Sequence, residues 1–378
     1  MGQKPKKSIS FGLKSTRIFT LAAMALLLAN CSVDVPALME EGKNAFYNGN
    51  YVEAKEAFKK CADEGDSQGQ FWLGYLTLLV NGHYSETDTL VMSRDGVISY
   101  CYDLFKKSAD QNDGDGYVGK YIVYSTDIGD WKDKTKAIEA LDKAVELNSY
   151  YGIAEKGLCL VKGNGYEQNI DEGVKLIKQS ADNGNDAGIT YLGTLYVLGN
   201  GVSKDINKGI ELLKNGANHG NRSANDVLAN LYFWGIEGEV SADESKAYKY
   251  AMNGSANNGN TALVLGFCYE YGKGVAQDDP MAAVYFRRSA LAGLPGGQYM
   301  WGMYCEKGYG SKQEALDNFL LAANQGHPTS MYKVGQYYLL GITGERDYAK
   351  ARLYLQGAAQ QGVEEAKDML KTYAILLY

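Results

Sequence analysis

Two amphipathic stripes, separated by a short glycine-bearing segment, show most simply in residues 185–220. Apolar and small side chains recur at helical spacing in residues 185–199 and again in residues 205–220. The first stripe comprises Ala187, Tyr191, Leu192, Leu195, Tyr196 and Leu198, and the second comprises Ile206, Ile210, Leu213 and Ala217. Gly220 then stands where a glycine commonly ends a helix. The pattern predicts a helix, a glycine loop, a second helix and a turn.

This unit recurs along the chain. Eight stretches align on a small residue in the middle of the first helix, with spacings of 45, 38, 36, 36, 37, 36 and 33 residues: Gly74, Gly119, Gly157, Gly193, Ala229, Gly266, Gly302 and Gly335. A second marker lies between them, with sequences such as KKCADEG, KQSADNG and LLAANQG. Two markers that share one period identify a repeat array, and the units of such an array stack on their neighbours. We therefore expect an all-α solenoid of about nine helix pairs.

The glycines of the repeat have two predicted roles. A glycine in a helix costs about 1 kcal/mol relative to alanine, so Gly193 and its equivalents need a packing reason, and we expect two helices to approach there without room for a Cβ. The segment GNGV at 199–202 lies between two helices. It lacks the third glycine of a dinucleotide-binding turn and the GK[ST] ending of a phosphate loop. These glycines are interpreted as turns, and a nucleotide site is not predicted.

Residues 192–220 and 265–293 resemble the Sel-one-like repeat family, a relative of tetratricopeptide repeats with a longer, glycine-bearing loop between its two helices. The first hairpin, residues 40–65, looks more like a plain tetratricopeptide unit, and the resemblance covers residues 36–362. It implies a right-handed superhelical α/α solenoid that serves as an adaptor or scaffold for protein complexes, and it does not imply a reaction. Two loops depart from the pattern, at residues 81–94 and 125–133. Residues 363–378 are expected to form a C-terminal capping helix, with Ile375, Leu376 and Leu377 packed on the last unit.

The tetratricopeptide resemblance also implies that the first helix of each pair lines the concave side. Groove positions then lie three residues before the aligned glycine and one, four and five residues after it. The candidates for partner binding are Phe71, Tyr75, Tyr124, Phe233, Trp234, Phe267, Tyr271, Tyr299, Met303 and Tyr332, with Lys120, Asn230, Glu270 and Gln336 among them. Aromatic residues are favoured anchors in protein interfaces, although helix-on-helix packing would explain the same residues. For the tyrosines three residues after the small residue we expect packing: Tyr196, Tyr232, Tyr269 and Tyr338.

The first thirty residues differ from the rest of the chain. They carry five basic residues and no acid, and an apolar run of about a dozen residues then leads to Cys31. This is typical of a secretory signal peptide over residues 1–30. The sequence LANC at 28–31 resembles the lipobox of bacterial lipoproteins, with Asn30 in place of the usual small residue. The resemblance implies lipidation of Cys31, an anchored linker over residues 31–35, and a location at the bacterial cell envelope, in the periplasm or at the outer membrane.

Charge and chemistry narrow the function classes. Without the five basic residues of the leader the chain carries 33 basic and 45 acidic residues, a net charge of −12, which argues against nucleic acid as a partner. The three histidines, His83, His219 and His327, fall in separate turns, and no HExxH or CxxC motif occurs. We therefore predict no metal site, no cofactor and no enzymatic activity, and free, mostly buried cysteines beyond Cys31.

Three functional hypotheses remain. The first is a membrane-tethered scaffold that binds a protein or peptide in the concave groove. The second is a surface lipoprotein that binds a peptide or glycan, since tyrosine and tryptophan also stack on sugar rings. The third, an enzyme of cell-wall or antibiotic metabolism, has no catalytic cluster behind it. A eukaryotic secreted protein is also open, because Asn221 and Asn253 begin glycosylation sequons.

Overall fold

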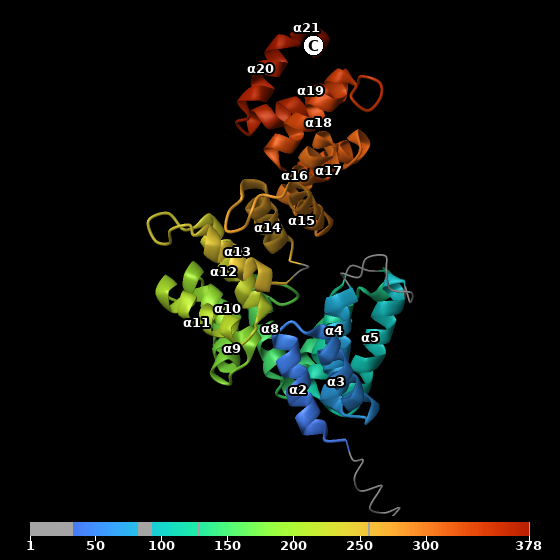
Figure 1. The fold of residues 1–378 in the computed structure, drawn as a ribbon, viewed down its shortest axis with the longest axis vertical. Coiled ribbons are helices and arrows are strands. Elements are labelled where there is room, and N and C mark those ends of the chain that lie inside the picture. Colours follow the sequence, from blue (N-terminus) through green and yellow to red (C-terminus); the bar gives the residue numbers. More distant parts are fainter. Residues whose placement is uncertain (1–32, 82–92, 127–128, 256–257, 378) are drawn as a thin grey trace, which may run out of the picture.

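The computed structural model describes residues 33–81, 93–126, 129–255 and 258–377 (Figure 1). This part of the chain contains twenty α-helices and no β-strand, apart from one isolated bridge between Ile236 and Val240. The predicted signal peptide and Cys31 lie outside the described residues, as does most of the loop 81–94. None of the described helices combines the length and the apolar character that a membrane crossing requires.

Within the described residues the helices form nine consecutive pairs, which confirms the all-α solenoid and the expected number of pairs. The first five pairs are α2 (Val35–Tyr47) with α3 (Tyr51–Asp63), α4 (Ser67–Asn81) with α5 (Arg94–Ala109), α6 (Gly114–Ser125) with α7 (Lys134–Glu146), α8 (Tyr150–Lys162) with α9 (Ile170–Asp182), and α10 (Asp186–Leu198) with α11 (Ile206–Asn218). The other four are α12 (Arg222–Trp234) with α13 (Glu244–Asn253), α14 (Gly259–Tyr271) with α15 (Asp279–Leu291), α16 (Pro295–Tyr304) with α17 (Lys312–Asn324), and α18 (Pro328–Leu340) with α19 (Tyr348–Gln360). A 3₁₀ turn, Gly129–Trp131, precedes α7, and a π-helical turn, Cys305–Tyr309, follows α16.

Local sequence sets the ends of these helices. The side chain of Asn185 accepts a hydrogen bond from the Gly188 amide at 3.1 Å and begins α10, and Asp205 does the same for α11 through the Lys208 amide at 3.0 Å. Between them Gly199 and Gly201 have φ angles of +69° and +68°, which favour glycine. The prediction that GNGV turns the chain is confirmed.

The mid-helix glycines allow the two helices of a pair to touch. A Cβ built on Gly157 of α8 would lie 2.8 Å from the carbonyl oxygen of Gly173 in α9, and one on Gly193 would lie 3.0 Å from the carbonyl oxygen of Gly209. On Gly266 the added atom would meet the Phe286 ring at 2.5 Å. The predicted close approach is therefore confirmed, because both backbone and core rings occupy the space that a side chain would need.

The array curves with its first helices on the inside. Successive first helices touch one another from α4 through α16, whereas no two successive second helices of the described chain approach as closely. In the N-terminal half the curl is tight, and the blue helix α2 lies beside the green helices of the middle repeats (Figure 1). The C-terminal pairs extend away from this curl towards the C-terminus.

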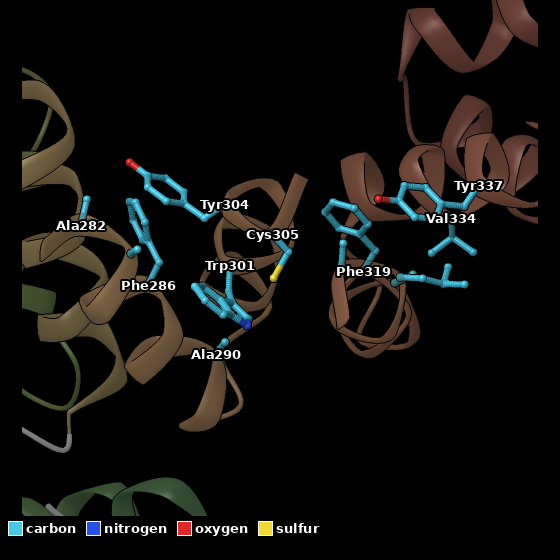
Figure 2. Packing of buried hydrophobic residues seen from close by; sticks show 13 residues of the cluster. Ala282, Phe286, Ala290, Trp301, Tyr304, Cys305, Phe319, Val334 and Tyr337 are labelled. Carbon is cyan, nitrogen blue, oxygen red and sulfur yellow. The ribbon is translucent and has the colours of Figure 1, made fainter. Parts of the chain in front are cut away.

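Each layer of the core joins one pair to the next. In the largest cluster Phe286 of α15 faces Tyr304 of α16 with ring centroids 5.1 Å apart, and Phe319 of α17 meets Tyr337 of α18 at 5.7 Å (Figure 2). All four rings are almost fully buried. Because a unit buries these rings only against its neighbour, the pairs depend on one another for stability.

The four tyrosines assigned to helix packing do pack between helices. Tyr232 stacks on Tyr250 with ring centroids 5.7 Å apart, and Tyr269 stacks on Tyr285 at 5.6 Å. The other two contact the second helix of their own pair, Tyr196 through Lys208 and Tyr338 through Tyr354.

The C-terminus differs from the expectation. Residues 363–378 do not form a single capping helix: α20 (Glu364–Thr372) ends at Tyr373, and a separate turn, α21 (Ala374–Leu377), follows. Ile375 is 97% exposed and Leu376 is 46% exposed, so the expected packing of these two side chains on the last unit is wrong. The break at Tyr373 separates α20 from this last turn, which still touches α19 but leaves Ile375 and Leu376 exposed.

Two further expectations concern the histidines and the glycosylation sequons. His219 is exposed at the end of α11, as expected of a turn residue, whereas His327 is half-buried, begins α18 and lies 5.1 Å from the Tyr299 ring. Asn221 of the first sequon is buried and caps α12 through the Ala224 amide. A glycan on Asn221 would therefore require this buried side chain to leave its place at the start of α12.

Candidate binding surfaces on the concave side

The sequence-predicted groove residues fall into separate groups on the concave side. Four of them form a continuous aromatic ladder on α12 and α14: Phe233, Trp234, Phe267 and Tyr271. Phe233 stacks on Phe267 with ring centroids 5.8 Å apart, and Phe267 stacks on Tyr271 at 6.0 Å. Trp234 stands edge-on to Phe233 at 4.8 Å. The ladder thus presents aromatic rings across two successive repeats.

Only the outer rings of the ladder face solvent. Trp234 is 60% exposed and Tyr271 is 58% exposed, whereas Phe233 and Phe267 are half-buried. Phe267 also packs on the buried Phe286 ring at 5.2 Å. The inner rings belong to the core, and the outer rings are free to meet another molecule.

Charged residues continue the concave side beyond the ladder. Glu270 of α14 pairs with Lys307 at 3.2 Å, and Glu306 pairs with Lys333 of α18 at 2.7 Å. The second carboxylate oxygen of Glu270 is buried near the Tyr271 and Tyr304 hydroxyls. Burial, followed by the Glu270 charge, raises the pKa of both hydroxyls.

Tyr299, Met303 and Tyr332 lie farther along the concave side and are half-buried. Tyr299 contacts Phe319 and His327, with ring centroids 6.0 Å and 5.1 Å away, so the core holds it in place. These three residues do not extend the ladder as exposed rings.

Phe71 and Tyr124 do not lie exposed on the concave side. Phe71 is 3% exposed and stacks between Tyr75 and Phe105, so it belongs to the core. The Tyr124 hydroxyl lies 2.8 Å from that of Tyr102 in α5, and Lys136 of α7 covers its ring, so it sits towards the second helices. The register differs because Gly119 of α6 packs on Phe105 of the preceding pair, whereas Gly157 and its equivalents face their own second helix.

A second surface, the tyrosine pocket, lies in the tightly curled N-terminal half. This pocket of about 300 Å³ is lined by Tyr75 of α4, Tyr151 of α8 and Tyr191 of α10, together with residues of α2. The Tyr75 and Tyr151 hydroxyls lie 3.4 Å apart, and the Tyr191 hydroxyl donates to Oε1 of Glu155 at 2.5 Å. Burial raises the pKa of the Glu155 carboxyl.

Helix α2 forms one side of this pocket. Tyr47 at the end of α2 lies against Gly220, where an added Cβ would be 2.4 Å from the Tyr47 carbonyl oxygen. Arg222 of α12 lies over the Tyr51 ring at 4.5 Å. Burial, followed by the charge of Asp186, raises the pKa of the Tyr47 hydroxyl. First and middle repeats therefore meet across the curl.

Tyr75 was among the predicted groove residues, whereas Tyr151, Glu155 and Tyr191 were not. Glu155 and Tyr191 stand two residues before their aligned glycines, and Tyr151 stands six before, whereas only positions −3, +1, +4 and +5 were taken as groove positions. The signal was present in the repeats, because residues one or two helical turns before position +1 share its face.

The remaining polar chemistry is sparse in the described ranges. They hold no group of three or more His, Cys, Asp or Glu side chains arranged to bind a metal ion. The five cysteines found there are free and buried, as expected: Cys61, Cys101, Cys159, Cys268 and Cys305. Burial raises the pKa of the Cys101 and Cys268 thiols to about 12, so these thiols are not poised as nucleophiles.

Comparison with known proteins gives one family and several similar folds. The Sel1 repeat model matches residues 90–113, 147–185, 187–221, 223–251, 262–294, 295–327 and 328–363. A protective antigen of uropathogenic Escherichia coli strains that displays an SLR fold is 24% identical, with 85% of this chain and 68% of that chain covered and a TM-score of 0.51. A Sel1 repeat protein from Oxalobacter formigenes is also 24% identical, with 84% and 90% covered and a TM-score of 0.49. No curated protein sequence matches significantly.

Proposed function

Since the chain belongs to the Sel1 repeat family, whose members are generally protein–protein interaction scaffolds, we propose that it binds a protein or peptide partner through the aromatic ladder. The family is typically non-catalytic, and a scaffold role fits it better than an enzymatic one. The observation that carries the proposal is the exposure of Trp234 and Tyr271 on the concave side, above half-buried rings that fix their positions.

The ladder has the properties of an interface centre. Large aromatic side chains contribute much of the binding free energy in protein complexes, especially where supporting residues hold them rigid. Trp234 lies edge-on to Phe267 at 5.9 Å, and Tyr271 is stacked on the same ring, so both anchors lose little conformational entropy on binding.

A pull-down from the native membrane fraction tests the proposal. The bait is the full protein, compared with a Trp234→Ala/Tyr271→Ala variant that removes only the exposed rings. The matched control is Leu291→Ala/Leu353→Ala, which removes two side chains that are 80% and 67% exposed on the second helices α15 and α19. Circular dichroism checks that all three proteins stay folded.

We expect a protein that the wild type and the control retain and the ladder variant loses. Retention of the same proteins by all three baits would show that the ladder is not the contact. If no bait retains a protein, a glycan array with the same variants tests the second hypothesis, a surface protein that binds a peptide or glycan.

We also propose that the protein is exported and anchored at the cell envelope through a lipid on Cys31. The basic leader, the apolar run and the cysteine that ends it support this proposal. A Cys31→Ser variant should leave the membrane fraction and lose lipid mass at the new N-terminus. Equal membrane association of both forms would contradict the anchor.

The net charge of −12 of the chain after the leader disfavours nucleic acid as a partner.

A further inference from the structure

Three tyrosines from three first helices gather around one carboxylate in the tyrosine pocket. Tyr151 and Glu155 stand one turn apart on α8, and the Tyr191 hydroxyl of α10 donates to Glu155. Tyr75 of α4 completes the group through the Tyr151 hydroxyl. All four side chains are half-buried. The three tyrosines line the pocket, and Glu155 lies behind them, hydrogen-bonded to Tyr191.

Glu155 has no cationic partner within ion-pair distance among the described residues. Lys156, the next residue, pairs instead with Asp142 at 2.6 Å. Lys162 lies on the same helix, is exposed, and exerts only a weak stabilising influence on the Glu155 charge. A desolvated carboxylate without a counter-ion is costly, and a bound cation would relieve that cost.

The two cations that line the pocket lie over aromatic rings. Lys43 of α2 lies over the Trp72 ring at 5.4 Å, and Arg222 lies over Tyr51. Asp115 and Asp186 also line the pocket, so its lining carries two cationic and two acidic side chains. Glu155, behind the tyrosines, adds a carboxylate that has no ion pair among the described residues.

We propose that the tyrosine pocket binds an organic cation, an ammonium or a guanidinium group, against the rings of Tyr75, Tyr151 and Tyr191, with the Glu155 carboxylate behind them. Electron-rich ring faces attract such cations, and a nearby carboxylate in a low-dielectric site adds to the attraction. A volume of about 300 Å³ accommodates the end of an arginine or lysine side chain or a small free amine. The site is separate from the aromatic ladder, which begins at Phe233, and does not depend on what the ladder binds.

Calorimetric titration of the full protein at low salt and pH 7 tests this site with matched probes. N-acetyl-arginine amide carries the cation, N-acetyl-citrulline amide has the same shape without the charge, and butylammonium represents a free amine. The variants are Glu155→Gln, which removes the charge at nearly constant shape, and Glu172→Gln, a control for an exposed carboxylate on α9.

We expect the wild type and the Glu172→Gln control to prefer the arginine probe over the citrulline probe by at least tenfold, and Glu155→Gln to lose that preference. Binding of butylammonium as well supports a site for any organic cation, and binding of the arginine probe alone supports a site for a guanidinium group of a partner. Equal binding of the arginine and citrulline probes, no binding of either cation at millimolar concentration, or an unchanged preference in Glu155→Gln would overturn the proposal.

Discussion

The mid-helix glycines give the sharpest test of the packing, and Gly157 is the best position. An alanine there would place its Cβ 2.8 Å from the Gly173 carbonyl oxygen, 2.8 Å from Cγ1 of Ile177 and 3.1 Å from the Ile177 amide nitrogen. Two of these three atoms belong to the backbone of α9, which cannot move aside as a side-chain end can. The two helices must therefore separate.

The expected magnitude follows from two opposing effects. Replacing a helical glycine by alanine stabilises the helix by about 1 kcal/mol, whereas overpacking a close contact costs about 1–3 kcal/mol. Because backbone atoms limit relaxation at Gly157, we expect Gly157→Ala to lower the free energy of unfolding by about 1–2 kcal/mol.

Gly357 of α19 provides the matched control. A Cβ there meets only the flexible Met331 sulfur at 3.3 Å, so Gly357→Ala should gain up to about 1 kcal/mol. Urea unfolding followed by circular dichroism measures both variants, with the transition midpoint and slope compared because repeat arrays need not unfold in one step. If Gly157→Ala raises the midpoint as Gly357→Ala does, close helix approach is not the reason why glycine recurs in the middle of the first helices of this chain.

Three further predictions concern charge, capping and thiols. Burial raises the pKa of Glu155 in the folded state, so its ionisation costs stability as pH rises above about 4.5. In urea titrations Glu155→Gln should therefore gain stability relative to the wild type between pH 4 and pH 7. A difference in unfolding free energy between the two proteins that stays constant over this pH range would contradict this. Asp205→Ala removes the cap of α11 and should lower the free energy of unfolding by about 1 kcal/mol, and an unchanged midpoint would show that water replaces the cap. Cys101, Cys268 and Cys305 should resist alkylation at pH 8 in the folded protein and react in urea, as mapped by mass spectrometry; rapid labelling of the folded form would refute their burial.

The sequence by itself determined the repeat, the helix pairs and the turns. The helices predicted within residues 185–199 and 205–220 are found as Asp186–Leu198 and Ile206–Asn218. These features depend on contacts within one unit: a side-chain cap at Asn185 and Asp205, a left-handed glycine at Gly199, and a glycine under the facing helix. Such contacts involve residues close in sequence, so the pattern contains the information needed to predict them.

Only the tertiary structure decided what the repeats bring together. The small rotation between neighbouring units adds up along the array, and it depends on how core rings fit between pairs, which no local pattern records. That sum places Tyr47 of α2 against the start of α12 and gathers Tyr75, Tyr151 and Tyr191 from three repeats into one pocket. It also turns α6 so that Tyr124 leaves the concave side. The chain's repeats are therefore readable from its sequence, but its candidate sites arise from the curvature that their stacking creates.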